Sequence, residues 1–181
     1  MPRPPRIDRA AVLAATLELA DTKGLPAVSM RAVADRLGVT PMALYRHVGD
    51  KQQLFDGLVE QLLMELPLPE AALPWRDRLQ AMASAMRATA RRHPDVFPLL
   101  LQRPAATPGA LRVREMVYQA LREAGVDEAD VARAERMLST FVIGFAASEA
   151  AGRFTLSTRD LDDDFAWAAA RMLDALVVPA G

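Results

Sequence analysis

The chain contains no cysteine and only two histidines, His47 and His93, among its 181 residues. The absence of cysteine excludes disulfide bonds, thiolate metal sites and a cysteine nucleophile, and it agrees with a reducing compartment. With only two imidazole side chains, the chain has few groups from which a histidine-based catalytic or metal-binding cluster could form. The sequence also lacks a G-x-S-x-G nucleophile elbow, a phosphate-binding loop and a dinucleotide fingerprint. We therefore predict no catalytic residue, no metal ligand and no cofactor, and we do not expect an enzyme.

Long hydrophobic runs are also missing, since none approaches the roughly 20 residues of a membrane-spanning helix. The first residues, M-P-R-P-P-R, are basic, but they lead into an amphipathic segment that contains Glu18 and Asp21, which is not typical of a secretory signal. Hydrophobic residues make up 51% and charged residues 25%, a balance that favours a soluble globular protein over a disordered one. We expect a cytoplasmic protein with no membrane partner.

The net charge of −1 argues at first against a nucleic-acid partner, because binding to duplex DNA depends on basic side chains. The distribution of charge favours the opposite conclusion. Residues 1–51 contain eight basic and five acidic side chains, a net charge of +3, so the remaining residues carry −4. The N-terminal third is therefore the end that we expect to face DNA.

The segment from Ser29 to Lys51 has the layout of two short helices around a tight turn. Ser29 and Thr40 are suited to cap the two helices, and Pro41 fits the first position of the second helix. Gly38 fits the turn, where a residue without Cβ can adopt a positive φ. Five apolar positions can converge on one small core, namely Val33, Leu37, Val39, Leu44 and Val48. This pattern predicts a helix-turn-helix unit, whose second helix would turn Met42, Tyr45 and Arg46, with His47, toward a DNA groove.

Capping residues and helical spacing of apolar side chains extend the prediction to the whole chain. The predicted helices cover 9–23, 30–37, the segment between Thr40 and Gly49, 51–66, 75–93, about 95–102, 110–124, 127–151 and a last stripe from Phe165 to Leu176. Asp8 and Asp50 are further caps, Pro67 to Pro74 marks a boundary, and 103–109 and 152–158 are predicted loops. Strand-like alternation and internal repeats are missing. The expected fold class is all-α.

The run R-A-V-A-D-R-L-G-V-T-P-M-A-L-Y-R-H-V-G-D-K, which ends at Lys51, resembles the signature of the TetR family of transcriptional repressors. A looser similarity to the tetracycline-repressor-type regulatory domain follows in Trp75-Arg76, Arg92-His93-Pro94 and Gly144-Phe145 ahead of Glu149. The resemblance implies a three-helix DNA-binding domain over 1–50, a connector helix over 51–66, and a helical effector-binding and dimerisation domain over 67–181.

The resemblance also implies which side chains contact double-stranded operator DNA: Arg31, Thr40, Pro41, Met42, Tyr45, Arg46, His47 and Lys51. Arg31 has the planar fork that pairs with guanine, although it could instead meet only a phosphate. Lys51 begins a helix, where an ammonium and the helix N-terminus can share one phosphate. Pro41 stands where the tetracycline repressor has a glutamine, so the operator sequence cannot be transferred to this chain.

In the body, the family fold implies an effector pocket and a dimer interface. We expect the pocket among Met64, Trp75, Met82, Met86, Phe97, Leu101, Tyr118, Met137, Phe141 and Phe145, although plain core packing is the commoner role for each. The last two helices are apolar on adjacent faces, which favours a second copy as partner. The predicted interface consists of Leu138, Val142, Phe145, Phe165, Ala169, Met172, Leu173 and Leu176.

Two further features have ordinary explanations. His93 precedes Pro94 at a helix end, where its side chain can cap backbone carbonyl groups. The acidic run from Asp160 to Asp164 lacks the glycine and distal glutamate of a calcium loop, and we interpret it as a solvated cap of the last helix.

The function that we predict is that of a homodimeric repressor, released from a palindromic operator by a small, mainly apolar ligand. A helical binding module that acts through protein contacts, and a ligand-dependent activator, stay open as alternatives. A reader of DNA should show the steep salt dependence that a protein-binding module lacks. The sequence does not identify the effector, the operator or the target genes.

Overall fold

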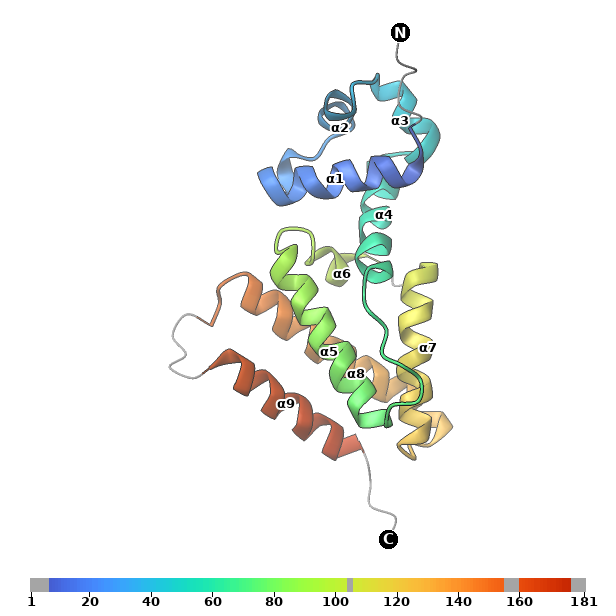
Figure 1. Ribbon diagram of the computed structural model, residues 1–181, viewed down its shortest axis with the longest axis vertical. Coiled ribbons are helices and arrows are strands. Elements are labelled where there is room, and N and C mark those ends of the chain that lie inside the picture. The colour runs from blue at the N-terminus through green and yellow to red at the C-terminus, as the bar shows by residue number, and fades with distance from the viewer. Residues whose placement is uncertain (1–6, 104–105, 155–159, 177–181) are drawn as a thin grey trace.

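The computed structural model describes residues 7–103, 106–154 and 160–176, and within these ranges it is built from helices without strands (Figure 1). The prediction of an all-α fold is confirmed. The helices are α1 (Arg9–Lys23), the 3₁₀ turn η1 (Leu25–Ala27), α2 (Met30–Leu37), α3 (Pro41–Val48), α4 (Lys51–Met64), α5 (Trp75–Arg92), α6 (Leu99–Gln102), α7 (Pro108–Glu123), α8 (Glu128–Ala150) and α9 (Leu161–Leu176).

Helices α1 to α3 form a small head at one end of the molecule, and α5 to α9 form the body (Figure 1). The head helices begin and end where the sequence predicts. Asp8 Oδ1 accepts a hydrogen bond from the Ala11 amide at 2.8 Å, and Ser29 Oγ accepts one from the Ala32 amide at 3.1 Å. Gly38 ends α2 with a φ of 67°, a left-handed conformation that few other residues adopt. These local signals fix the turn between α2 and α3.

One detail of that prediction is wrong, namely the side-chain cap of α3 by Thr40. Thr40 occupies the N-cap position of α3, but its side chain makes no capping hydrogen bond. Pro41 follows and has no amide hydrogen, so the helix start already has one donor fewer to satisfy. Asp50, by contrast, caps α4 as predicted, because its Oδ1 accepts from the Gln53 amide at 2.9 Å.

The connector helix α4 runs from the head into the body (Figure 1). Its apolar side chains Leu54, Leu58 and Leu62 are almost completely buried, in the same hydrophobic cluster as Val12 of the head and Phe97 of the body. Burial of this kind contributes on the order of 2 kcal/mol for each large side chain. The head and the body are therefore joined by a continuous core. A second cluster, around Leu79, Leu121 and Leu173, lies within the body.

The body differs from the prediction at two helix boundaries. The segment 94–98 forms turns and α6 begins only at Leu99, because Pro98 has no amide hydrogen to donate. Helix α7 begins at Pro108, two residues before the predicted start, since Thr107 caps it by accepting from the Ala110 amide at 3.3 Å. The predicted loop 152–158 lies partly outside the described residues.

In the body, α5 packs along α8, α7 lies beside α4 and α8, and α9 lies against α5 and α8 (Figure 1). None of the described helices is both long enough and apolar enough to cross a membrane. Helices α5, α7, α8 and α9 thus pack together in the body, and α4 contacts this group through α7.

Candidate functional site

The outer surface of α3 presents the side chains that the motif predicts to face a DNA groove. Met42 is 68% exposed and Tyr45 is 47% exposed, and Arg46 is exposed with them. On the other side of the helix Leu44 and Val48 are buried. Because positions three and four apart share one side of a helix, Met42, Tyr45 and Arg46 form one surface, which we call the reader face.

The other predicted DNA contacts flank the reader face along the chain. Thr40 and Pro41 are exposed at the start of α3, and His47 is half-buried near its end. Arg31 is exposed at the start of α2, with its Nε 4.0 Å from Oδ2 of Asp35. Both side chains of this pair are mostly exposed, and such pairs contribute at most about 1 kcal/mol. The guanidinium of Arg31 is therefore held only weakly.

Lys51 is the first residue of α4, where the helix N-terminus attracts anions. Its ammonium lies 5.2 Å from the centre of the Phe55 ring, at the distance of a cation–π contact. The side chain itself is exposed. An anion at this helix end would meet both the ammonium and the positive end of the helix dipole.

The connector helix is tied to the body by polar contacts that the sequence did not reveal. Glu60 on α4 accepts hydrogen bonds from the amide of Gly109, with both carboxylate oxygens at 2.9 Å. A Cβ at position 109 would lie 2.9 Å from one of these oxygens, so a glycine allows the close approach. Arg112, one turn along α7, donates to the carbonyl oxygens of Leu63 and Met64 at the end of α4. Helix α7 thus holds α4 at two points.

Two more contacts join the head and α4 to the body. Arg103, which follows α6, has its Nε 2.8 Å from Oδ1 of Asp56 on α4. His93 at the end of α5 is buried, and its Nδ1 lies 2.8 Å from Oδ2 of Asp21 on α1. The expectation that His93 caps backbone carbonyls is corrected, because the ring binds a carboxylate of the head. No sequence pattern marks a contact between residues so far apart.

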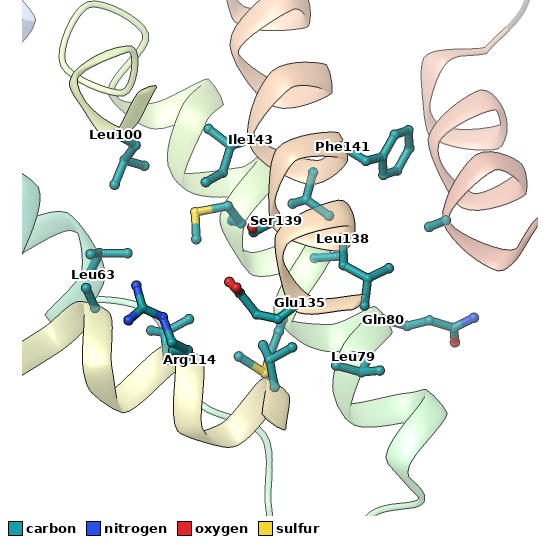
Figure 2. A pocket seen from close by; sticks show the side chains of 18 of the residues that line it. Leu63, Leu79, Gln80, Leu100, Arg114, Glu135, Leu138, Ser139, Phe141 and Ile143 are labelled. Atoms are coloured by element: carbon teal, nitrogen blue, oxygen red, sulfur yellow. The ribbon is translucent and has the colours of Figure 1, made fainter. Parts of the chain in front are cut away.

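A cavity of about 170 Å³ lies between α5, α7, α8 and α9, and Leu63 of α4 closes one side of it (Figure 2). Most of its wall is apolar. Its polar side chains are Gln80, Arg114, Glu135 and Ser139. Figure 2 shows the carboxylate of Glu135 directed from α8 toward α7, the helix that carries Arg114. Such an apolar space with few polar groups is typical of a small-molecule site.

Three of the residues predicted for an effector pocket, Met82, Met86 and Phe141, line this cavity. The others lie elsewhere. Phe97 is completely buried in the core between head and body, and Trp75 and Tyr118 pack against the second hydrophobic cluster. Three more are at least 43% exposed at the surface, namely Met64, Leu101 and Met137, and Phe145 packs against other aromatic rings. Helical spacing identifies a buried face, but it does not tell which neighbouring helix that face meets.

The residues predicted for a dimer interface mostly face the interior of their own chain. Leu138, Val142, Ala169 and Leu173 line the cavity, and Met172 and Leu176 pack against the second cluster. Phe145 and Phe165 contact each other, with ring centres 5.1 Å apart. Four of the eight, Leu138, Phe165, Ala169 and Leu173, are at most 9% exposed and have little surface left for a partner. The large apolar side chains exposed on α8 and α9 are instead Met137 and Trp167, the latter 68% exposed.

An ion-pair network joins α5, α8 and the start of α9, with the side chains of Arg87 and Glu149 buried and those of Arg91 and Asp162 exposed. Arg87 holds the carboxylate of Glu149 with two hydrogen bonds of 2.6 and 2.7 Å. Arg91 binds both Glu149 and Asp162, at 2.7 and 2.6 Å. The guanidinium of Arg87 also lies 4.9 Å from the centre of the Phe165 ring. Asp162, predicted as part of a solvated cap, is therefore an ion-pair partner of two arginines.

These contacts shift the acidity of both carboxyl groups. Burial alone would raise the pKa of Glu149, but the hydrogen bonds from Arg87 and Arg91 outweigh it and hold this pKa below its ordinary value. The hydrogen bond from Arg91 likewise lowers the pKa of Asp162. Among the described residues, no group of three histidine, aspartate or glutamate side chains is arranged to hold a metal ion. Because its ion pairs join α5 to α8 and to the start of α9, the network acts as a clamp between these helices.

The comparisons with known proteins match both parts of the chain. Residues 12–58 match the family model of the bacterial regulatory proteins of the tetR family, and residues 66–177 match the tetracyclin repressor-like C-terminal domain. The two models together cover most of the head, the first half of the connector helix and the body. The chain is thus similar to one family over most of its length.

Individual relatives agree with these models. The chain is 36% identical to an HTH-type transcriptional regulator of Saccharopolyspora erythraea over 150 residues, 82% of this chain and 64% of that protein. It is 34% identical to the HTH-type transcriptional repressor DrrR1 of Streptomyces coeruleorubidus over 140 residues, 76% of this chain and 52% of that protein. The chain thus spans between half and two thirds of the length of these relatives. Both relatives are named as regulators of transcription.

A solved structure extends the similarity to three dimensions. The crystal structure of BioQ with its natural double-stranded DNA operator superposes on the chain with a TM-score of 0.81 at 28% identity. The match covers 95% of this chain and 99% of BioQ. The arrangement of head and body described above is therefore one that is found in a protein bound to DNA.

Proposed function

Because this chain belongs to the TetR family of bacterial transcriptional regulators, we propose that it is a homodimeric repressor that binds a palindromic operator and leaves it when a small, mainly apolar ligand binds. The observation that carries this proposal is the reader face, in which α3 buries Leu44 and Val48 and exposes Met42, Tyr45 and Arg46. The relative DrrR1 is named a repressor, and BioQ has been solved on its operator.

In this proposal the reader face enters the major groove. Arg31 pairs with a guanine edge, because its fork reaches two acceptors at once and its pair with Asp35 is easily exchanged. Tyr45 and His47 contact phosphates or thymine methyl groups, and Lys51 binds a phosphate at the start of α4. Thr40 and Pro41 bring the start of α3 close to the sugar–phosphate backbone. The division into a DNA-binding part over 1–50 and an effector part over 67–181 belongs to the same proposal.

The proposal requires two copies, because one short helix contacts only a few base pairs. We place the contact between copies on the outer sides of α8 and α9, where Met137 and Trp167 are exposed. Burying these two side chains against a partner removes apolar surface that is otherwise in contact with water. Two reader faces would then meet successive major grooves about 34 to 36 Å apart.

Release by a ligand follows from the position of the cavity. Leu63 of α4 and Ala110 of α7 both line it, and α7 holds α4 through Glu60 and Arg112. A ligand that fits better when α7 and α4 have moved favours that state, since it acts only through its differential affinity for the two states. Because α4 follows the head in the chain, its movement changes the spacing of the two reader faces.

The experiment that tests this function is enrichment of random duplex DNA by the purified chain, followed by titration of the recovered duplex and of a scrambled control. We expect a palindrome, bound by two chains. Tyr45→Ala should weaken its binding without changing the mass measured by sedimentation. Uniform weak binding with no enriched sequence would contradict the proposal and favour the reading of the chain as a module for protein contacts.

Trp167→Glu is the complementary variant. It places a charge on the proposed contact between copies, so we expect it to shift the sedimenting species toward the monomer and to weaken operator binding as a consequence. Exposed Gln119 on α7 offers a control, because Gln119→Ala should change neither property. An unchanged sedimentation profile for Trp167→Glu would exclude this side of α9 as the contact.

A further inference from the structure

The reader face is apolar where α3 begins and polar further along the helix. Pro41 and Met42 are the first two residues of α3, and both side chains are exposed, that of Met42 to 68%. Tyr45 and Arg46, about one turn further along the helix, are exposed too and carry hydrogen-bonding groups. The first turn of α3 therefore offers DNA an apolar side chain, and the second turn offers polar ones.

The position of Met42 directs it to the edges of bases. In a helix-turn-helix unit, the N-terminal residues of the second helix contact base edges in the major groove. Met42 lies on the side of α3 opposite to Leu44, which is buried in the core. Its thioether has no N–H or O–H to donate, and the sulfur accepts hydrogen bonds only weakly. The side chain of Met42 therefore distinguishes bases through apolar contact.

Thymine is the base that offers an apolar group in the major groove, its C5-methyl. Guanine presents two acceptors there, cytosine presents a donor, and adenine presents one of each. An apolar side chain that covers these polar groups removes them from water without replacing their hydrogen bonds, which costs free energy. Against thymine, in contrast, the methionine side chain and the methyl group are removed from water together.

We propose that Met42 selects a thymine in each half of the operator by contact with its C5-methyl group. This inference rests on the proposed function, because it takes α3 to be the helix that enters the major groove. It goes further by assigning one base of the operator, the chemical group that is recognised and the residue that recognises it.

Uracil tests the proposal without any change to the protein, because it differs from thymine only by the missing C5-methyl. Each thymine of the enriched duplex is replaced in turn, together with its symmetry mate, and every duplex is titrated by anisotropy at one salt concentration. We expect at least one replacement to weaken binding by about fourfold for each half-site, the effect of one methyl group that stays in water. Equal affinity for all these duplexes would overturn the proposal.

A second replacement at the sensitive position separates the methyl group from the rest of thymine. Cytosine there removes the methyl group and changes the hydrogen-bonding edge, and 5-methylcytosine returns a methyl group to the same place in the groove. We expect the duplex with 5-methylcytosine to bind about fourfold more tightly, for each half-site, than the duplex with cytosine. Equal binding of these two duplexes would overturn the proposal.

Two variants test whether Met42 is the residue that recognises the methyl group. Met42→Ala should bind the thymine duplex and the uracil duplex alike at this position. Met42→Gln introduces an amide that pairs with adenine, so enrichment with this variant should recover adenine in place of the thymine. Met64→Ala is the matched control, because Met64 is 52% exposed at the end of α4, outside the reader face, and the preference for thymine should persist. A preference for thymine that persists in Met42→Ala would overturn the assignment.

Failure of this proposal and failure of the proposed function give different results. Enrichment that recovers no palindrome contradicts the proposed function, and this proposal with it. An enriched palindrome that binds equally with and without its thymine methyl groups overturns this proposal alone.

Discussion

The head and the body of this molecule place the same side chain, arginine, in opposite environments. Arg31 and Arg46 in the head are exposed, and Arg31 lies 4.0 Å from the exposed carboxylate of Asp35. In the body, Arg78 and Arg87 are buried and pair with Glu123 and Glu149. An exposed guanidinium can exchange its partner for a phosphate or a base, whereas a buried pair holds helices together and is lost only at a large cost. In the proposed function, Arg31 and Arg46 of the head are available to an external partner, whereas Arg78 and Arg87 of the body hold helices together.

The largest effect that this contrast predicts is on stability. Arg87→Ala leaves Glu149 buried with Arg91 as its remaining arginine partner, so we expect the free energy of unfolding to fall by about 3 kcal/mol in urea titrations. Arg133→Ala is the control, because that side chain is 79% exposed and pairs within its own helix with Asp130. It should change stability by less than about 0.5 kcal/mol. Similar losses in the two variants would remove the distinction between buried and exposed arginines.

The next effect concerns DNA. Arg31→Ala should weaken binding to the enriched duplex by about 1 to 3 kcal/mol and relax the preference at one base pair, with little change in stability. Arg133→Ala again provides the comparison, because it removes an equally exposed arginine from the body. Anisotropy titrations of the two variants measure this difference. Equal losses of affinity for the two variants would show that the exposed charges of the head have no special role in DNA binding. If Arg31→Ala instead weakens the binding of every duplex by the same factor, Arg31 contacts a phosphate and not a base.

A smaller effect is expected where head and body meet. Asp21→Asn weakens the contact with buried His93, and we expect a loss of about 1 kcal/mol in unfolding free energy. Asp95→Asn, an exposed carboxylate near the same helix end, should have almost none. The combination of Asp21→Asn with His93→Gln should cost less than the sum of the two single changes. Additive losses would show that the two side chains do not interact.

The smallest effect is on the pH dependence of stability. The pKa values of Glu149 and Asp162 are lowered in the folded chain, so the stability that they contribute is present above their ordinary values of 4.5 and 3.8 and is lost as the pH falls below them. Arg91→Gln removes part of the cause, so its unfolding free energy should fall less steeply below about pH 4.5. Parallel pH profiles for the two proteins would contradict this origin of the shifts.

The head and the body also differ in how much of their structure could be predicted from the sequence. The helices of the head and the start of the connector helix were predicted closely, because Asp8, Ser29 and Asp50 cap their own helices and Gly38 ends one by its own conformation. Thr40 was predicted to cap α3, and it occupies the N-cap position without a side-chain hydrogen bond. All these signals lie within a few residues of what they determine.

The cavity and the clamp could not be predicted in this way, because they depend on which helices become neighbours. Glu135 and Arg114 alternate with apolar residues as solvent-facing side chains do, yet they line the cavity. Leu138 and Leu173 have the spacing of an interface, yet their partners belong to the same chain. Asp162 was interpreted as a cap because its partners, Arg87 and Arg91, are more than 70 residues away in the sequence.

The most direct test of the contrast between head and body is the salt dependence of binding to the enriched duplex, measured between about 50 and 200 mM salt for the original chain and for Arg31→Ala. We predict that affinity falls steeply as salt rises, that a scrambled duplex binds much more weakly at every salt concentration, and that Arg31→Ala reduces this difference. Affinity that is independent of salt and equal for both duplexes would contradict the account, because the exposed charges of the head would then not bind DNA.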